Sequence, residues 1–157
     1  MTENEYRKFL KNLNIAKLKL DNGNTVEQEL VKHAKILADC IAEQLFITYT
    51  GYTPKVYERT YGLLHSVYVG DKIHVDTKGN KLSISVDVAF DDGAVHQGFD
   101  GQNVNVARLL NDGWQTHGRF ADVEYFGYRI GTHFMENAIE EYKHKVKNPL
   151  DVQINYL

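Results

Sequence analysis

The sequence lacks several features that define whole classes of protein. Its single cysteine, Cys40, excludes an intrachain disulfide and any metal site built from several cysteines. No apolar run approaches the ~20 residues of a membrane span, so we expect no membrane-embedded segment and no membrane partner. The first ten residues lack the apolar stretch of a secretory signal. With only two prolines and no linker-like tract, we expect a single domain over residues 1–157.

The composition is that of a globular chain without an excess of either charge. Hydrophobic residues make up 43% and charged residues 25% of the sequence, which argues against disorder. Eighteen basic and 21 acidic residues give a net charge of -3, which disfavours general binding to nucleic acid. Ten tyrosines stand out, and they suit a protein with large, semi-polar contact surfaces.

A long amphipathic helix is predicted over residues 25–50. Thr25 and Gln28 have the spacing of a capping box at its start. Apolar residues then recur every three or four positions, which marks one buried face: Val26, Leu30, Ala34, Leu37, Ile41 and Leu45. We expect Phe46 and Ile47 to widen this face, and Gly51 to help end the helix.

Two alternating runs, residues 67–75 and 82–88, predict strands with one buried face. Lys78-Gly79-Asn80 lies between them, so we expect an antiparallel hairpin. A second long helix is predicted from about Thr132 to Lys147, stopped by Pro149. The fold class is therefore α+β: an antiparallel β-sheet with the long N-terminal helix and the C-terminal helix packed on one face.

The shorter segments carry weaker signals. Before the hairpin we expect an N-terminal arm or short helix within 1–24 and a helical turn near Leu63. After it we expect an exposed glycine-rich loop over 90–102, a short helix around 104–110 capped by Gly113, and a polar loop from Gly118 to Gly127. Last we expect a terminal strand through Val152, Ile154 and Tyr156.

Seven histidines raise the question of a metal or catalytic site, but none forms a compact ligand pair. A site assembled from loops would draw on His96, His117, His133, Asp91, Asp92, Asp100 and Asp122. We favour solvated histidines and turn-forming aspartates instead. His33 is expected to be a packed or boundary histidine. Cys40 lies in mid-helix and is expected to be a small buried hydrophobe, so we expect no catalytic residue, metal or cofactor.

The tyrosine-rich run over residues 52–62 is the segment that most suggests a contact surface. Tyrosine and arginine are enriched at the centres of protein–protein interfaces, and Arg59 is our choice of central contact. A nucleic-acid or peptide platform is less favoured, because Lys55 and Arg59 are the only cations there and Glu58 opposes them. The other interpretation left open is a loop packed on its own domain.

Three blocks in order resemble a known family: the helix over 25–50; Arg59-Thr60-Tyr61-Gly62-Leu63-Leu64-His65-Ser66 running into a strand; and Ala107-Arg108-Leu109-Leu110-Asn111-Asp112-Gly113 followed by Gly131-Thr132-His133-Phe134-Met135-Glu136-Asn137-Ala138-Ile139. Together they resemble the minor tail-component family of long-tailed bacteriophages, which includes neck and tail-completion proteins. Departures from the family pattern include Tyr61 before Gly62, Trp114 after Gly113, and His133 and Glu136 at proline positions.

The resemblance implies a structural virion protein at the head–tail junction or tail end, a homo-oligomeric ring around the DNA channel. Its partners would be other copies and neighbouring neck, portal or tail-tube proteins, with DNA passing through without specific recognition. We expect loop residues to form the subunit contacts: Tyr52, Tyr57, Arg59, Tyr61, Phe99 and Trp114. Two alternatives stay open: a small enzyme with a His/Asp loop site, and a cytoplasmic binding module unrelated to virions.

Overall fold

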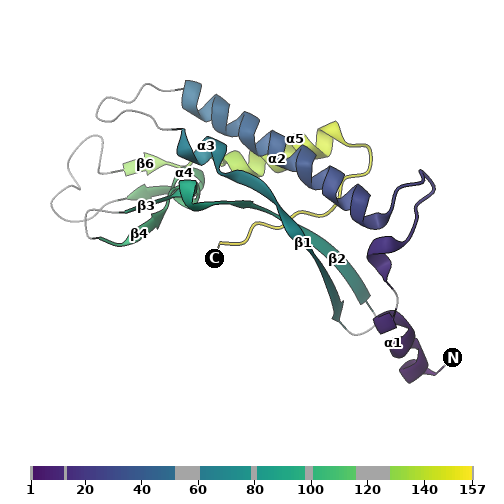
Figure 1. The fold of residues 1–157 in the computed structure, drawn as a ribbon. Coiled ribbons are helices and arrows are strands. Elements are labelled where there is room, and N and C mark those ends of the chain that lie inside the picture. Colours follow the sequence, from purple (N-terminus) through teal and green to yellow (C-terminus); the bar gives the residue numbers. More distant parts are fainter. Residues whose placement is uncertain are drawn as a thin grey trace.

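A computed structural model describes residues 2–12, 14–51, 61–78, 81–97, 101–115 and 128–156. The molecule is elongated (Figure 1). The long helix α2 (Val26–Thr50) runs along it beside α5 (Phe134–Lys145), and the hairpin of β1 (Val67–Lys78) and β2 (Lys81–Phe90) crosses beneath them. The fold is α+β, with the long helix, the C-terminal helix and the antiparallel sheet packed together, as the sequence predicts.

The start of α2 confirms the predicted capping box. The Thr25 hydroxyl accepts a hydrogen bond from the Gln28 backbone N–H at 3.2 Å, and the Gln28 side-chain oxygen accepts one from the Thr25 N–H at 2.9 Å. Two of the N–H groups that a helix leaves unpaired are thereby satisfied. At the other end Gly51 caps the helix, donating its N–H to the Ile47 carbonyl.

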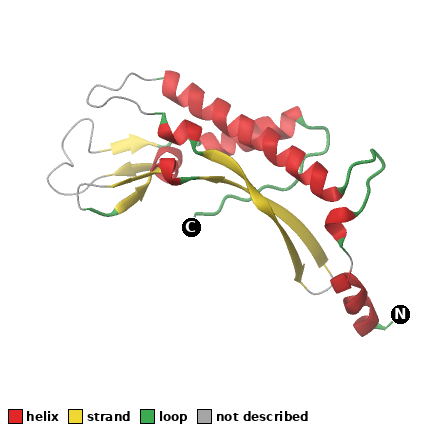
Figure 2. Cartoon of the chain, in the orientation of Figure 1, coloured by secondary structure: helices red, strands yellow, loops and turns green. Residues whose placement is uncertain are grey.

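The hairpin is also confirmed. β1 and β2 pair antiparallel from Val67 opposite Phe90 to Lys78 opposite Lys81, and they are the longest strands in Figure 2. The register shifts between Val69 and Ile73, so β1 carries a bulge there.

The core lies where α2, α5 and the inner end of the hairpin meet. Its buried members come from both long helices, from the shorter α3 (Gly62–His65) and α4 (Val106–Asp112), and from the 3-10 turn η2 (Asp92–Ala94): Leu37, Cys40, Ile41, Leu45, Leu63, Ala94, Ala107, Leu110, Phe134, Met135, Ala138 and Tyr142. Phe90 of β2 meets Phe134 of α5 edge to face, with ring centroids 6.2 Å apart. No helix within the described ranges is both long and apolar enough to cross a bilayer.

Short elements complete the chain. They are α1 (Glu3–Asn12), the 3-10 turns η1 (Ile15–Lys17) and η2 (Asp92–Ala94), and the strand pairs β3 (Val95–Gln97) with β4 (Asn103–Asn105) and β5 (Gly113–Gln115) with β6 (Tyr128–Ile130). The helix within residues 1–24, the turn near Leu63 and the short helix capped by Gly113 agree with the sequence predictions. The predicted loop from Gly118 to Gly127 lies outside the described residues.

Two predictions are wrong. Residues 90–102 are not simply an exposed loop, because η2 and β3 form there; Asp91 accepts the Gly93 N–H at 2.7 Å and Ala94 is buried. The segment 152–156 is not a strand. Its alternating Val152 and Ile154 pack on the core instead, so burial rather than strand pairing explains their period.

The last helix is shorter than predicted. Thr132 and His133 donate their N–H groups to the carbonyls of Leu110 and Asn111, at 2.9 and 3.0 Å, so these residues are tied to α4 and α5 begins only at Phe134. The chain turns extended at Val146, before Pro149 is reached.

Leu37→Ala is expected to lower the free energy of unfolding by about 2–5 kcal/mol, through lost burial and the cavity left behind. Leu37 is 8% exposed at the centre of the α2 face. Urea denaturation followed by circular dichroism measures the change. Leu18→Ala is the control, since Leu18 is 43% exposed and its loss should cost far less. A loss below about 1 kcal/mol at Leu37 would contradict the assignment of this face to the core.

An ion-pair cluster joins the two long helices. Lys145 of α5 places its ammonium 2.8 Å from a Glu43 carboxylate oxygen and 2.6 Å from one of Glu141. Gln44 of α2 donates a further hydrogen bond to Glu141 at 2.8 Å. These donors, Lys145 first, hold the pKa of Glu141 down to about 2 from its ordinary 4.5, and the same contact raises the pKa of Lys145.

This cluster predicts a stability change in acid. Because the pKa of Glu141 is depressed in the folded chain, its contribution is fully present above about pH 4.5 and is lost as the pH falls toward about 2. We expect the melting temperature of the wild type to fall more steeply across this window than that of Glu141→Gln. Thermal melts at half-unit steps of pH measure the difference; parallel curves would contradict a role for Glu141.

Candidate assembly surface

Four of the six residues expected in subunit contacts lie outside the described residues: Tyr52, Tyr57, Arg59 and Phe99. The other two, Tyr61 and Trp114, are described. Tyr61 precedes α3 and Trp114 lies in β5.

Tyr61 is held in place by an aromatic neighbour. Its ring meets that of Tyr49, in the last turns of α2, edge to face at 5.5 Å. Its backbone is left-handed, with φ at 56°, a conformation that costs a non-glycine residue about 1–3 kcal/mol and needs support from its surroundings. The side chain nevertheless remains 42% exposed, so Tyr61 is a fixed aromatic group on the surface.

Trp114 is partly buried and engaged within its own chain. The guanidinium of Arg129, opposite it in β6, lies 5.4 Å from the centroid of the indole ring. This cation–π contact stabilises the β5–β6 pair. It also leaves less of the Trp114 ring surface free to contact another subunit.

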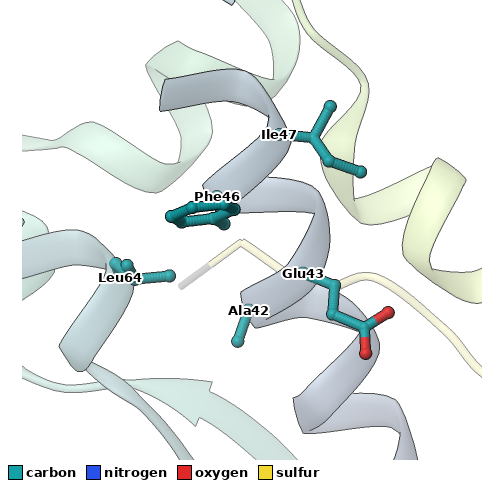
Figure 3. Close-up of a pocket in the computed structure, with 5 residues that line it drawn as sticks. All are labelled: Ala42, Glu43, Phe46, Ile47 and Leu64. Carbon is teal, nitrogen blue, oxygen red and sulfur yellow. The ribbon is translucent and has the colours of Figure 1, made fainter. Parts of the chain in front are cut away.

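The structure adds an apolar surface that the sequence did not predict. Phe46 and Ile47 are 56% and 57% exposed, although both were expected to widen the buried face of α2. With Ala42 and Leu64 they form what we call the α2 patch, which with Glu43 lines an open hollow of about 440 Å³. In Figure 3 the Phe46 ring is directed toward Leu64 of α3, while the side chains of Ile47 and Glu43 project to the right of the helix in this view.

The helical period explains the error. Leu45 is fully buried, and at 3.6 residues per turn the next two positions rotate away from the face it marks. Phe46 and Ile47 therefore broke the period rather than extending it. Two apolar residues placed off the buried stripe were the available signal for an exposed apolar surface.

The last resemblance block assembles around one buried side chain, Asn111. Its amide nitrogen lies 3.0 Å from Asp112 Oδ1, 3.2 Å from Glu136 Oε1 and 3.2 Å from Tyr156 Oη, and its oxygen accepts the Met135 N–H at 2.9 Å. The Tyr156 hydroxyl donates to Asp112 at 2.8 Å. The hydrogen bond from Asn111, followed by that from Tyr156, lowers the pKa of Asp112. We call this cluster the α4–α5 junction; it ties α4, α5 and the C-terminal segment together.

Two glycines let the chain cross itself beside this junction. Gly113 has φ at +82°, and a Cβ on it would lie 3.0 Å from the Ile130 carbonyl carbon and still closer to backbone atoms of Arg129 and Gly131. A Cβ on Gly131 would meet the backbone of Asn111 and Asp112. Both positions therefore require glycine for close approach.

The second resemblance block is also structural. Leu63 and Ser66 are buried, at 3% and 1% exposure. The Ser66 hydroxyl donates to the Leu63 carbonyl at 2.8 Å, and its own carbonyl accepts the Asp91 N–H at 2.9 Å. This block thus fixes α3 at the base of the hairpin.

The residues considered for catalysis or metal binding do not meet in the part of the chain that is described. No group of three His, Cys, Asp or Glu side chains comes together there as a metal site. Of the histidine/aspartate candidates, His117, Asp100 and Asp122 lie outside it, as does the side chain of His96. His133 is exposed at the start of α5, and Asp91 caps η2, as turn chemistry predicts.

The two helical candidates are core residues, as expected. His33 is buried and its Nδ1 lies 2.7 Å from the Tyr142 hydroxyl. The same hydroxyl accepts the Leu150 N–H at 2.8 Å, so Tyr142 links His33 of α2 to the segment that follows α5. Cys40 has no exposed surface, and burial raises the pKa of its thiol, which disfavours the thiolate form that acts as a nucleophile.

Comparison with known proteins places the chain in a family. No curated protein and no solved structure matches the chain. A family model described as YomN matches residues 9–152, a range that includes α2, the hairpin, α4 and α5. The chain therefore belongs to the YomN family.

Proposed function

We propose that the chain is a structural bacteriophage virion protein at the head–tail junction or tail end. In this role it forms a homo-oligomeric ring around the DNA channel and binds neighbouring neck, portal or tail-tube proteins. The observation that carries the proposal is that all three resemblance blocks contain buried residues that hold the fold together. They lie in α2, the Leu63–Ser66 turn and the α4–α5 junction.

Buried residues support a resemblance better than surface residues do, because they determine how elements meet. Ser66 and Asn111 are fully enclosed polar residues whose hydrogen bonds are made within the chain. A buried polar group is costly unless its bonds are satisfied, so such residues specify one arrangement of their neighbours. Resemblance at these positions therefore favours an arrangement of α2, the hairpin and α5 like that of the minor tail-component family.

The α2 patch supports assembly in particular. Phe46 and Ile47 expose more than half of their surface on a rigid helix, and Tyr61 stands fixed near its end. Aromatic and aliphatic groups held in place lose little conformational freedom on binding. A patch of this kind is typical of a surface covered by another protein.

The charge of the chain fits a channel rather than a DNA-binding protein. A ring that lets DNA slide must avoid the many phosphate contacts that make binding tight. The net charge is -3, and several described lysines are already paired with carboxylates: Lys32, Lys143 and Lys145.

Sedimentation velocity of the full chain tests the proposal. We expect species far heavier than the 18.0 kDa monomer at concentrations of tens of micromolar. Phe46→Asp should shift the distribution toward the monomer, because a carboxylate would have to be desolvated in the contact. Its melting temperature should stay close to that of the wild type, since Phe46 is mostly exposed.

Leu18→Asp is the matched control, an exposed apolar residue outside the α2 patch, and it should assemble normally. A wild type that stays monomeric at every concentration, alone and with portal or tail-tube proteins added, would refute the ring. Equal assembly of Phe46→Asp and the wild type would exclude the α2 patch from the contact.

A further inference from the structure

The hairpin carries two strand edges that have no partner strand in the described part of the chain. Its sheet contains β1 and β2 only, with strands of 12 and 10 residues. An unpaired edge presents a row of free N–H and C=O groups, which natural proteins usually block or cover. In Figure 1 the outer half of the hairpin extends away from α2.

The pairing register identifies the residues whose backbone faces outward. Two residues separate the paired Lys78 and Lys81, so these two form the hydrogen-bonded pair that closes the hairpin. Counting from this pair away from the turn, hydrogen-bonded and non-hydrogen-bonded pairs alternate. In each non-hydrogen-bonded pair the N–H and C=O groups point away from the partner strand. On β2 the outward residues are Leu82, Ile84 and Val86, and on β1 they are Thr77, Val75 and Ile73.

One side-chain contact agrees with this alternation. The Ser83 hydroxyl donates to the Asp76 carbonyl at 3.4 Å, so that carbonyl is directed toward β2. Asp76 and Ser83 lie opposite each other in the register, and they form one of the hydrogen-bonded pairs between β1 and β2.

The edge of β2 lacks the usual protection against pairing. From Leu82 to Phe90 the only charged residue is Asp87, and this stretch contains neither lysine nor proline; Lys81, the single lysine of β2, lies at its turn end. β1 differs, because its bulge between Val69 and Ile73 interrupts any ladder that a neighbour would form. A regular edge therefore remains on β1 only over residues 73–78.

The apolar side of the hairpin continues past the core. Val67 and Val88 pack on the core at the inner end. Farther out, Val75 pairs with Ile84 on the same side, and Val75 is 52% exposed. A strand added at either edge would extend this side and cover more of it.

We propose that the outer edge of β2 over residues 81–86 pairs antiparallel with the outer edge of β1, over 73–78, of a second copy of the chain. The two edges have the same usable length, and both alternate apolar with polar side chains. Joining unlike edges of identical chains is a head-to-tail contact, which closes into a ring when the rotation permits. The inference rests on the proposed ring and names the contact that builds it.

Edge pairing alone is too small to hold a ring together. A stable interface buries about 1,200–2,000 Å² in total, more than six residues of strand edge supply. We therefore expect the α2 patch, near the other end of the molecule from the hairpin tip (Figure 1), to contribute to the same assembly.

Ile84→Pro tests the pairing. Proline removes the outward N–H of residue 84 without removing a bond to β1, and an edge strand tolerates it at such a position. Ile84→Ala is the matched control, since it loses the same side chain but keeps the N–H. By sedimentation velocity we expect Ile84→Ala to assemble and Ile84→Pro to shift to the monomer, with melting temperatures within a few degrees of each other.

The outcomes separate this inference from the proposed function. If the wild type assembles and a folded Ile84→Pro assembles equally well, the edge contact is wrong and the ring stands. If the wild type never assembles, both fail. Should Ile84→Pro not fold, cross-linking decides the question.

Introduced cysteines report the contact without disturbing the backbone. Cys40 has no exposed surface, so only the new thiols react. We expect an intermolecular disulfide when Asp76→Cys is mixed with Ser83→Cys or Ser85→Cys, and none with any variant alone. Alternate strands are about 9.6 Å apart, beyond the ~7 Å that a disulfide spans. Cross-linking of Ser83→Cys alone, or none in either mixture while the chains assemble, would overturn the proposal.

Discussion

Gly113→Ala is expected to be among the most damaging single substitutions in the chain, with a loss of about 3–5 kcal/mol in the free energy of unfolding. The added Cβ would collide with the backbone of Arg129, Ile130 and Gly131. None of these atoms belongs to a flexible side chain, so β5 and β6 would have to separate. The positive φ of +82° adds further strain. Urea denaturation of the full chain measures the loss.

Two further variants separate the causes. Gly23 also has a positive φ, +83°, but a Cβ there meets nothing within 4 Å; Gly23→Ala should lose only about 1–2 kcal/mol, the cost of the left-handed backbone. Gly131 makes a similar close approach without a positive φ. Gly131→Ala therefore tests the collision alone, and its loss in free energy of unfolding should approach that of Gly113→Ala. If Gly113→Ala and Gly23→Ala lose the same amount, the close crossing is not what requires glycine.

Asn111→Ala is expected to cost about 3–5 kcal/mol, because it removes the centre of a buried hydrogen-bond network. The Met135 N–H would lose its acceptor, and Glu136 and Tyr156 would lose a shared donor. The pKa of Asp112 should rise toward its ordinary value, since Asn111 is the main cause of its depression. Denaturation measures the first effect, and carboxyl chemical shifts followed against pH measure the second.

Asn137→Ala is the control for this variant. Asn137 is exposed on α5, the other helix of the junction, and its side chain donates one long bond, 3.4 Å to the Thr132 carbonyl, so its loss should stay within about 0.5 kcal/mol. A change of similar size at both asparagines, or an unchanged pKa of Asp112, would show that the α4–α5 junction does not depend on Asn111.

The sequence predicted the elements whose determinants are local. The capping box of α2 involves residues three positions apart, and the hairpin follows from two alternating runs separated by a short turn. His33 and Cys40 were correctly expected to pack, because their places on the helix face fixed their burial. The strands β3 and β4 were missed since three residues are too few to establish a period.

Contacts between distant segments were beyond sequence reasoning. Asn111 meets Glu136 and Tyr156 across 25 and 45 positions, and no spacing rule connects them. The α2 patch was missed for a different reason: Phe46 and Ile47 were assigned to the core because they are apolar, although their angular position pointed away from it. The expected contacts at Tyr52, Tyr57, Arg59 and Phe99 stay predictions.

The central claim, a ring-forming virion protein at the head–tail junction or tail end, is tested most directly by a three-dimensional reconstruction of phage particles whose genome encodes this chain. The account predicts density for several copies around the DNA channel at that place, with the β1–β2 hairpins of adjacent copies side by side. Complete, infectious particles in which no density at the neck or tail end fits α2, α5 and the hairpin would contradict it.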